Sequence, residues 1–207
     1  MTDSRLQRFL LLVLVSLLAA IGAVLVATRQ SGDASTTPKS KFDGPTMPPG
    51  LQAANFSLLD QNGQRVTMSQ YRGHVVILTF IHSLCHDACP FMVEQIKGAL
   101  NDLPNYGRGV PAIGISVEPG EDTRANRVRF LVKHEMNARL AFVNGPRPAM
   151  RQVWHAYAIQ PVQGPIDHST FVLLIDKRGF ERVGFAADQL TPEELAHDIR
   201  VLQREPA

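Results

Sequence analysis

Hydrophobic and polar residues follow one another along this chain in a pattern that predicts an α/β domain. An unbroken apolar and largely β-branched run over Val75–Ile81 is typical of a strand buried on both faces. A second apolar run covers Val110–Val117, and the residues after Pro90 place apolar side chains at helical spacing. The pattern therefore predicts a buried strand, a loop, a helix and another buried strand, in that order.

The rest of the folded part is predicted to contain two β-hairpins and three further helices. The hairpins are expected over residues 55–68, with Asn62-Gly63 in the turn, and over residues 171–185. A short strand is expected over residues 141–143. The helices are expected over residues 122–136, residues 148–158 and the segment after Thr191, where Pro192 and Glu194 fit the first turn. A β-α-β unit followed by a β-β-α unit is a thioredoxin-like arrangement, an α/β fold with a mixed sheet flanked by helices.

The N-terminal segment is predicted to be a transmembrane helix. Phe9–Ala27 contains no charged residue, and about 19 helical residues span roughly 28 Å, close to the thickness of the hydrocarbon core of a bilayer. The alternative is a cleaved signal peptide ending near Ala27, but its apolar region is usually shorter. Because Arg5 and Arg8 precede the segment, we expect the N-terminus on the cytoplasmic side.

These observations predict four parts. They are a cytoplasmic stub (1–8), a transmembrane anchor (9–27), a flexible tether rich in Ser, Thr and Pro (28–50), and a thioredoxin-like domain (51–207). The stub is too short for an Arg-rich transit peptide. We therefore expect a single-pass protein of the inner (cytoplasmic) membrane whose C-terminal domain lies on the periplasmic side.

The composition argues against nucleic acid as a partner. The 207 residues carry a formal net charge of +2, and 44% are hydrophobic, as in an ordinary globular protein. No basic stripe interleaved with aromatic residues is present, so we expect no nucleic-acid binding.

The chemistry is expected at the only two cysteines, Cys85 and Cys89. They lie between the first buried strand and the next helix, and Cys89 falls where the helix N-terminus favours a thiolate. Thiolates attack disulfides and bind soft metals. Two sulfurs alone make a poor zinc site, whereas copper(I) accepts few soft ligands and an added imidazole makes a site that also tolerates copper(II).

The histidine that would complete such a site is not decided by the residues alone. Of the seven histidines, four are expected to be packed or surface residues: His74, His134, His155 and His197. His82 and His86 are close to the cysteines in sequence. His168 is remote, but it directly precedes the strand predicted to begin at Phe171. In a thioredoxin-like fold the loop entering that strand packs against the redox loop, so His168 stands as an equal alternative.

Several motifs in this chain resemble the Sco/SenC family of copper proteins, which is named for synthesis of cytochrome c oxidase. Cys85–Pro90 together with Asp167-His168-Ser169 is similar to the cysteine pair and distal histidine of that family. Ser116–Thr123 and Val172–Asp176 are similar to two further family segments. The resemblance extends from about Leu51 to the C-terminus.

The resemblance implies a membrane-tethered thioredoxin-like domain that binds one copper ion through Cys85, Cys89 and His168. It also implies a role for Asp87 beside the ligands, although Asp87 could equally be a turn or capping residue. The implied task is to supply copper to, or to reduce the cysteines of, the copper site of a terminal oxidase subunit. Other periplasmic copper chaperones or thioredoxin-like reductants are further expected partners.

Departures from the family pattern indicate a divergent member. His86 replaces the usual proline, His82 and Ser83 replace an aromatic residue and threonine, and Glu118 replaces aspartate. We hypothesise that His82 and His86 add a ligand or a transient docking point for copper.

Three other functions compete with copper delivery. A copper-independent periplasmic thiol-disulfide oxidoreductase would use the same two cysteines, although such enzymes usually carry C-x-x-C. A peroxidase is disfavoured because Leu78 and His82 stand where proline and threonine or serine are expected before Cys85. A purely structural disulfide closing so small a loop would contribute little stability.

Overall fold

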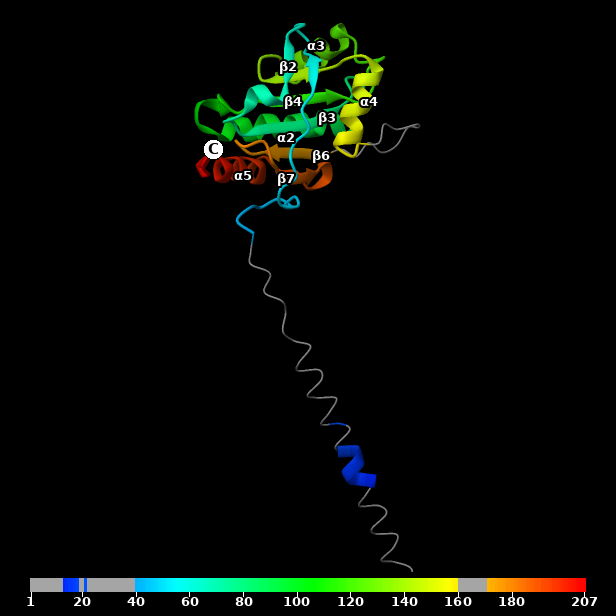
Figure 1. The fold of residues 1–207 in the computed structure, drawn as a ribbon, viewed down its shortest axis with the longest axis vertical. Helices are drawn as coiled ribbons and strands as arrows, with labels where there is room; N and C mark the ends of the chain where they lie inside the picture. The colour runs from blue at the N-terminus through cyan, green and yellow to red at the C-terminus, as the bar shows by residue number, and fades with distance from the viewer. Residues whose placement is uncertain (1–12, 19–20, 22–39, 160–170) are drawn as a thin grey trace, which may run out of the picture. The chain divides into compact units, whose positions relative to one another are not determined.

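The computed structural model describes residues 13–18, 21, 40–159 and 171–207. The chain divides into two compact units, Met1–Lys39 and Ser40–Ala207 (Figure 1). Residues 13–18 of the first unit are helical and exposed.

No helix among the described residues is both long and apolar enough to cross a membrane. Most of the anchor predicted over residues 9–27 lies outside the described residues, as do the predicted stub and residues 28–39 of the predicted tether. These assignments therefore remain predictions.

The second unit contains two β-sheets with helices around the larger one (Figure 1). The smaller sheet is the hairpin of β1 (Ser57–Leu59) and β2 (Arg65–Thr67). The strands of the larger sheet are β3 (Val76–Ile81), β4 (Ala112–Ser116), β5 (Leu140–Val143), β6 (Phe171–Ile175) and β7 (Glu181–Ala186). The α-helices of this unit are α2 (Ala88–Asp102), α3 (Arg124–Lys133), α4 (Arg147–Ala156) and α5 (Pro192–Arg204). Short 3₁₀ helices cover Met68–Tyr71, Pro104–Gly107 and Ala187–Gln189.

The larger sheet is mixed, with strand order β5-β4-β3-β6-β7. The strands β3, β4 and β5 run parallel, whereas β6 is antiparallel to β3 and β7 is antiparallel to β6. The predicted α/β fold with a mixed sheet is therefore confirmed. Because β3 and β4 are parallel and β6 is antiparallel to β3, the ends of β3 and β4 and the start of β6 lie at the same edge of the sheet.

Strand β3 is buried along its whole length because both faces of the sheet are covered. Its residues Ile77 and Ile81 contribute to an apolar cluster that includes side chains of α2, α3 and α5. The alternate residues Val76, Leu78 and Phe80 contribute to a second cluster with α4 and the β1–β2 hairpin. This division is the reason that the sequence of β3 is apolar without alternation.

Helix α3 begins at Arg124, next to the predicted start near residues 121–123. Thr123 is its N-cap, and the Thr123 hydroxyl accepts a hydrogen bond from the backbone N–H of Asn126. The N-cap is therefore one of the capping residues expected at positions 121–123. Asp122, beside it, turns its carboxylate toward Ser83 and Ser116.

Residues 40–50, which we call the N-terminal strap, pack along β7. Phe42 is buried in the same cluster as Phe185, and Thr46 forms an isolated antiparallel bridge with Val183. The backbone N–H of Gly184 donates to the carbonyl of Pro45 at 2.9 Å. The last part of the predicted tether is thus in contact with the domain that was expected to begin near Leu51.

We expect Thr191→Ala to lower the free energy of unfolding by about 1 kcal/mol. The Thr191 hydroxyl accepts a hydrogen bond from the N–H of Glu194 at 3.3 Å, as the sequence predicted, and alanine removes this cap of α5. Urea unfolding of the full chain would measure the loss. Thr191→Ser keeps the hydroxyl and should stay near wild type; equal losses in both variants would contradict the capping role.

Candidate metal centre

The cysteine pair lies at the junction of β3 and α2. Cys85 is in the loop that follows Ile81, and its backbone N–H donates to the carbonyl of His82 at 3.1 Å, closing a turn. Cys89 lies in the first turn of α2. Cys89 is fully buried, whereas Cys85 is partly exposed. The two sulfurs are not joined in a disulfide.

The two thiols contact each other. The Cys85 and Cys89 side chains are hydrogen-bonded, and the backbone N–H of His82 donates to the Cys89 Sγ at 3.4 Å. The hydrogen bond with Cys85, and next to it burial, raises the pKa of the Cys89 thiol far above its ordinary value, although the His82 N–H acts in the opposite direction. The raised pKa favours the protonated thiol of Cys89.

This finding corrects one expectation from the sequence. The helix start at Cys89 was predicted to favour a thiolate, and Cys89 does lie in the first turn of α2. Burial and the neighbouring sulfur outweigh the effect of the helix end. A soft metal must therefore displace a thiol proton in order to bind this pair.

A buried carboxylate holds the loop before Cys85 in place. Asp122 is fully buried, and its Oδ1 accepts a hydrogen bond from the backbone N–H of Ser83 at 2.7 Å. Its Oδ2 accepts a hydrogen bond from the hydroxyl of Ser116, the last residue of β4. Trp154 donates from Nε1 to the Ser116 carbonyl at 2.9 Å, and Asn144 donates to the Asp122 carbonyl at the same distance. These bonds tie the cysteine loop to the end of β4.

Sequence reasoning missed this role of Asp122. The residue lies in the segment Ser116–Thr123, whose similarity to a family motif was the available signal. Nothing in the local pattern distinguishes a carboxylate that starts a helix from one that accepts hydrogen bonds from a distant loop.

The two histidines near the cysteines differ in their surroundings. His82 places its Nε2 at 2.9 Å from Oε2 of Glu121, within ion-pair distance but outside hydrogen-bond geometry. His86 is exposed, as is Asp87. Asp87 occupies the N-cap position of α2, but its side chain forms no capping hydrogen bond.

His168 lies outside the described residues, so its predicted role as a ligand remains a prediction. The strand that follows it is described. β6 begins at Phe171, and the hydroxyl of Thr79 in β3 donates to the Phe171 carbonyl at 3.1 Å. The start of β6 therefore lies beside the end of β3, where the cysteine loop begins.

The remaining histidines lie elsewhere on the domain. His74 and His155 are exposed. His134 is buried, with Nδ1 at 2.8 Å from Oε1 of Glu94. His197 in α5 lies beside the carboxylates of Asp43 and Asp198. Among the described side chains, no histidine, aspartate or glutamate joins the two cysteines in a group of three potential ligands.

Comparison with known proteins shows what this chain is similar to in sequence and in fold. The sequence model of the SCO1/SenC family matches residues 46–204. An SCO2-like protein of Rickettsia typhi is 26% identical over 184 residues, covering 82% of this chain and 86% of that protein. The mitochondrial SCO2 homolog of Danio rerio is 27% identical over 139 residues, covering 62% of this chain. That stretch is 49% of the zebrafish protein, so the match spans about half its length.

A solved structure shares the fold. Bradyrhizobium japonicum ScoI, solved with copper bound, superposes with a TM-score of 0.63 and 28% identity, covering 73% of this chain and 99% of that chain. The predicted thioredoxin-like fold is confirmed by this similarity and by the strand order of the mixed sheet.

We expect Asp122→Ala to destabilise the domain by about 2–3 kcal/mol, because it leaves the Ser83 N–H and the Ser116 hydroxyl without a charged acceptor. The same change should speed reaction of Cys89 with a thiol reagent under native conditions. Urea unfolding and timed alkylation would measure the two effects. The exposed Asp188→Ala is the matched control, and the anchoring role is wrong if both variants behave alike.

Proposed function

The chain belongs to the SCO1/SenC family, and from that membership we propose that it is a membrane-tethered copper-binding protein for assembly of a terminal oxidase. Its task would be to supply copper to the oxidase copper site or to reduce the cysteines of that site. Copper is then the cargo of the protein. The observation that carries the proposal is the contact between two thiols at the edge of the sheet where β6 begins.

We propose Cys85, Cys89 and His168 as the ligands. The two sulfurs already touch, so a single soft ion can bind both once their protons leave. In the sequence, His168 precedes Phe171, the first residue of β6, by three residues, and three residues of chain reach at most about 10 Å. The relative from Bradyrhizobium japonicum was solved with copper bound, which supports copper as the metal.

The two cysteines differ in exposure to solvent, and this difference would allow an ion to pass from this protein to another. Cys89 is fully buried, whereas Cys85 is partly exposed. The neighbouring side chains of Leu84 and His86 are exposed as well. An accepting protein can therefore approach from the side of Cys85 while Cys89 still holds the ion.

The copper-independent thiol-disulfide oxidoreductase is the second candidate, favoured by the same thiol contact. An exposed Cys85 would attack a disulfide of the client and release one client thiol, and Cys89 would then displace the second. The two cysteines end as a disulfide and the client gains two electrons and two protons. A thioredoxin-like reductant would have to return the pair to thiols.

The tether and location complete the proposal. We propose that residues 9–27 anchor the protein in the inner membrane as a single span, with the C-terminal domain on the periplasmic side. The support is the uncharged apolar run and the two arginines that precede it, Arg5 and Arg8.

Copper titration tests the ligand set. We expect the reduced full chain in detergent to bind about one copper(I) ion. Cys85→Ser and Cys89→Ser should each weaken binding by more than about 100-fold, because the loss of a ligand exceeds the effect of an outer hydrogen bond. His168→Ala should weaken it as well and alter the copper(II) spectrum.

Matched variants complete that experiment. His155→Ala removes an exposed histidine on α4 and should leave copper binding unchanged. Loss of binding in His82→Ala or His86→Ala, with His168→Ala unaffected, would assign the imidazole ligand to the loop instead. Fast reduction of an insulin-type disulfide without any copper binding would favour the oxidoreductase.

A further inference from the structure

A second group of potential metal ligands lies where the N-terminal strap meets α5. The strap is held there by backbone hydrogen bonds to β7, including Met47 N–H to the Arg182 carbonyl at 2.9 Å. Gly44 is required for this close approach, because a Cβ on it would come 2.4 Å from the Phe185 ring. The position of Asp43 relative to α5 is therefore determined by packing.

The buried carboxylate of Asp198 fastens the strap to α5. Asp198 is fully buried, and its Oδ1 and Oδ2 accept hydrogen bonds from the backbone N–H groups of Asp43 and Gly44, at 2.8 and 3.0 Å. The two N–H groups fix the orientation of this carboxylate.

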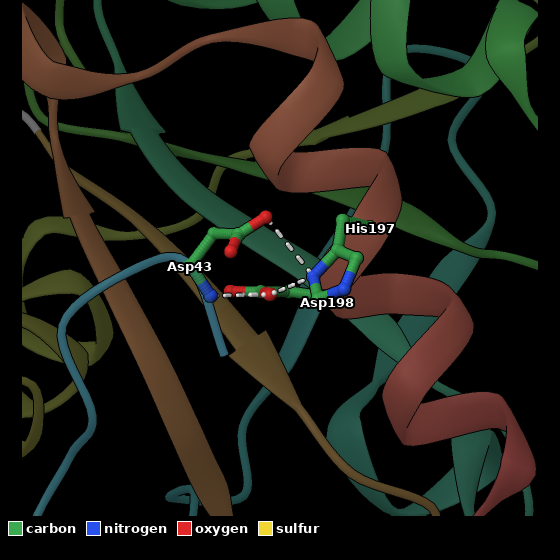
Figure 2. Close-up of side chains that lie close together, drawn as sticks. All are labelled: Asp43, His197 and Asp198. Atoms are coloured by element: carbon green, nitrogen blue, oxygen red, sulfur yellow. Dashed lines mark hydrogen bonds and ion pairs between the residues drawn. The ribbon is translucent and has the colours of Figure 1, made fainter. Parts of the chain in front are cut away.

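Three side chains converge beside this anchor, as Figure 2 shows. The Nδ1 atom of His197 lies 2.9 Å from Oδ1 of Asp198 and 3.1 Å from Oδ2 of Asp43. The side chains of His197 and Asp43 are 45% and 49% exposed, so water can reach the group from outside. Among the described residues, this is the one group of three or more histidine, cysteine or acidic side chains that could hold a metal ion.

We propose that Asp43, His197 and Asp198 bind a divalent transition-metal ion of the zinc type. Zinc bonds of about 2.0–2.2 Å place neighbouring ligand atoms roughly 3–3.4 Å apart at angles between 90° and tetrahedral. The observed separations of 2.9 and 3.1 Å need to grow by only a few tenths of an ångström. Water would complete the coordination on the exposed side.

Charge and ligand type favour a divalent ion over copper(I). As metal ligands, two carboxylates and one imidazole nitrogen carry two negative charges in total, which one divalent ion balances. Nitrogen and oxygen ligands suit zinc and its neighbours, whereas copper(I) prefers the sulfur of the cysteine pair. The ion would replace the hydrogen bond between His197 Nδ1 and Asp198, and any proton that Nδ1 carries would leave to solvent. A bound ion would link the N-terminal strap, through Asp43, to α5, through His197 and Asp198.

The test uses the full chain in detergent with Cys85→Ser and Cys89→Ser, which removes the thiols and makes the result independent of the proposed copper function. The probe is Zn²⁺ alone. Calorimetry measures its binding, and thermal unfolding measures its effect on stability. We expect about one Zn²⁺ per chain, and a rise in unfolding temperature of about 5 °C at a hundredfold excess over the dissociation constant.

Variants of the two exposed ligands decide whether the ion binds at this group. In the same background, His197→Ala and Asp43→Asn should each weaken Zn²⁺ binding at least tenfold and reduce the thermal shift. The matched controls, His155→Ala and Asp102→Asn, change exposed residues of α4 and α2 and should change neither. Asp198 is kept because its carboxylate also holds the strap. Absence of Zn²⁺ binding, or binding unaffected by His197→Ala, would show that the group is an ion pair only and overturn the proposal.

Discussion

A carboxylate removed from water is costly unless hydrogen bonds compensate it, and Asp122 meets this condition with bonds from Ser83 and Ser116. The carboxylate of Asp122 can be buried because the Ser83 N–H donates a hydrogen bond to it. The same hydrogen bond holds the cysteine loop in its position. The position of Cys85, two residues beyond Ser83, therefore depends on a residue from a different loop of the domain.

The topology of the sheet explains why these distant segments meet. The parallel strands β3 and β4 end at one edge, and the antiparallel β6 begins there. Side chains that are far apart in the sequence can therefore come into contact at this edge, and no local sequence pattern predicts the contact. The same edge carries the thiol pair, the Asp122 anchor and the start of the strand that follows position 168.

The two groups proposed as metal sites differ in what holds them. Cys89 is fully buried, and its hydrogen bond with Cys85 raises its pKa, which favours the thiol over the thiolate. Asp198 is fully buried, and its carboxylate accepts hydrogen bonds from the backbone of the strap. Sulfur ligands with displaceable protons suit an ion in transit, whereas a fixed carboxylate with an imidazole suits an ion that stabilises the fold.

Local patterns in the sequence were sufficient for the elements and for the cysteine pair. The buried run of β3, the hairpins and the cap at Thr191 follow from side-chain periodicity and backbone chemistry, which act over a few residues. The protonation of Cys89, the anchoring by Asp122 and the meeting of Asp43 with α5 could not be predicted in this way. Each depends on burial and on hydrogen bonds between segments far apart in the chain, and only the tertiary structure determines which of them touch.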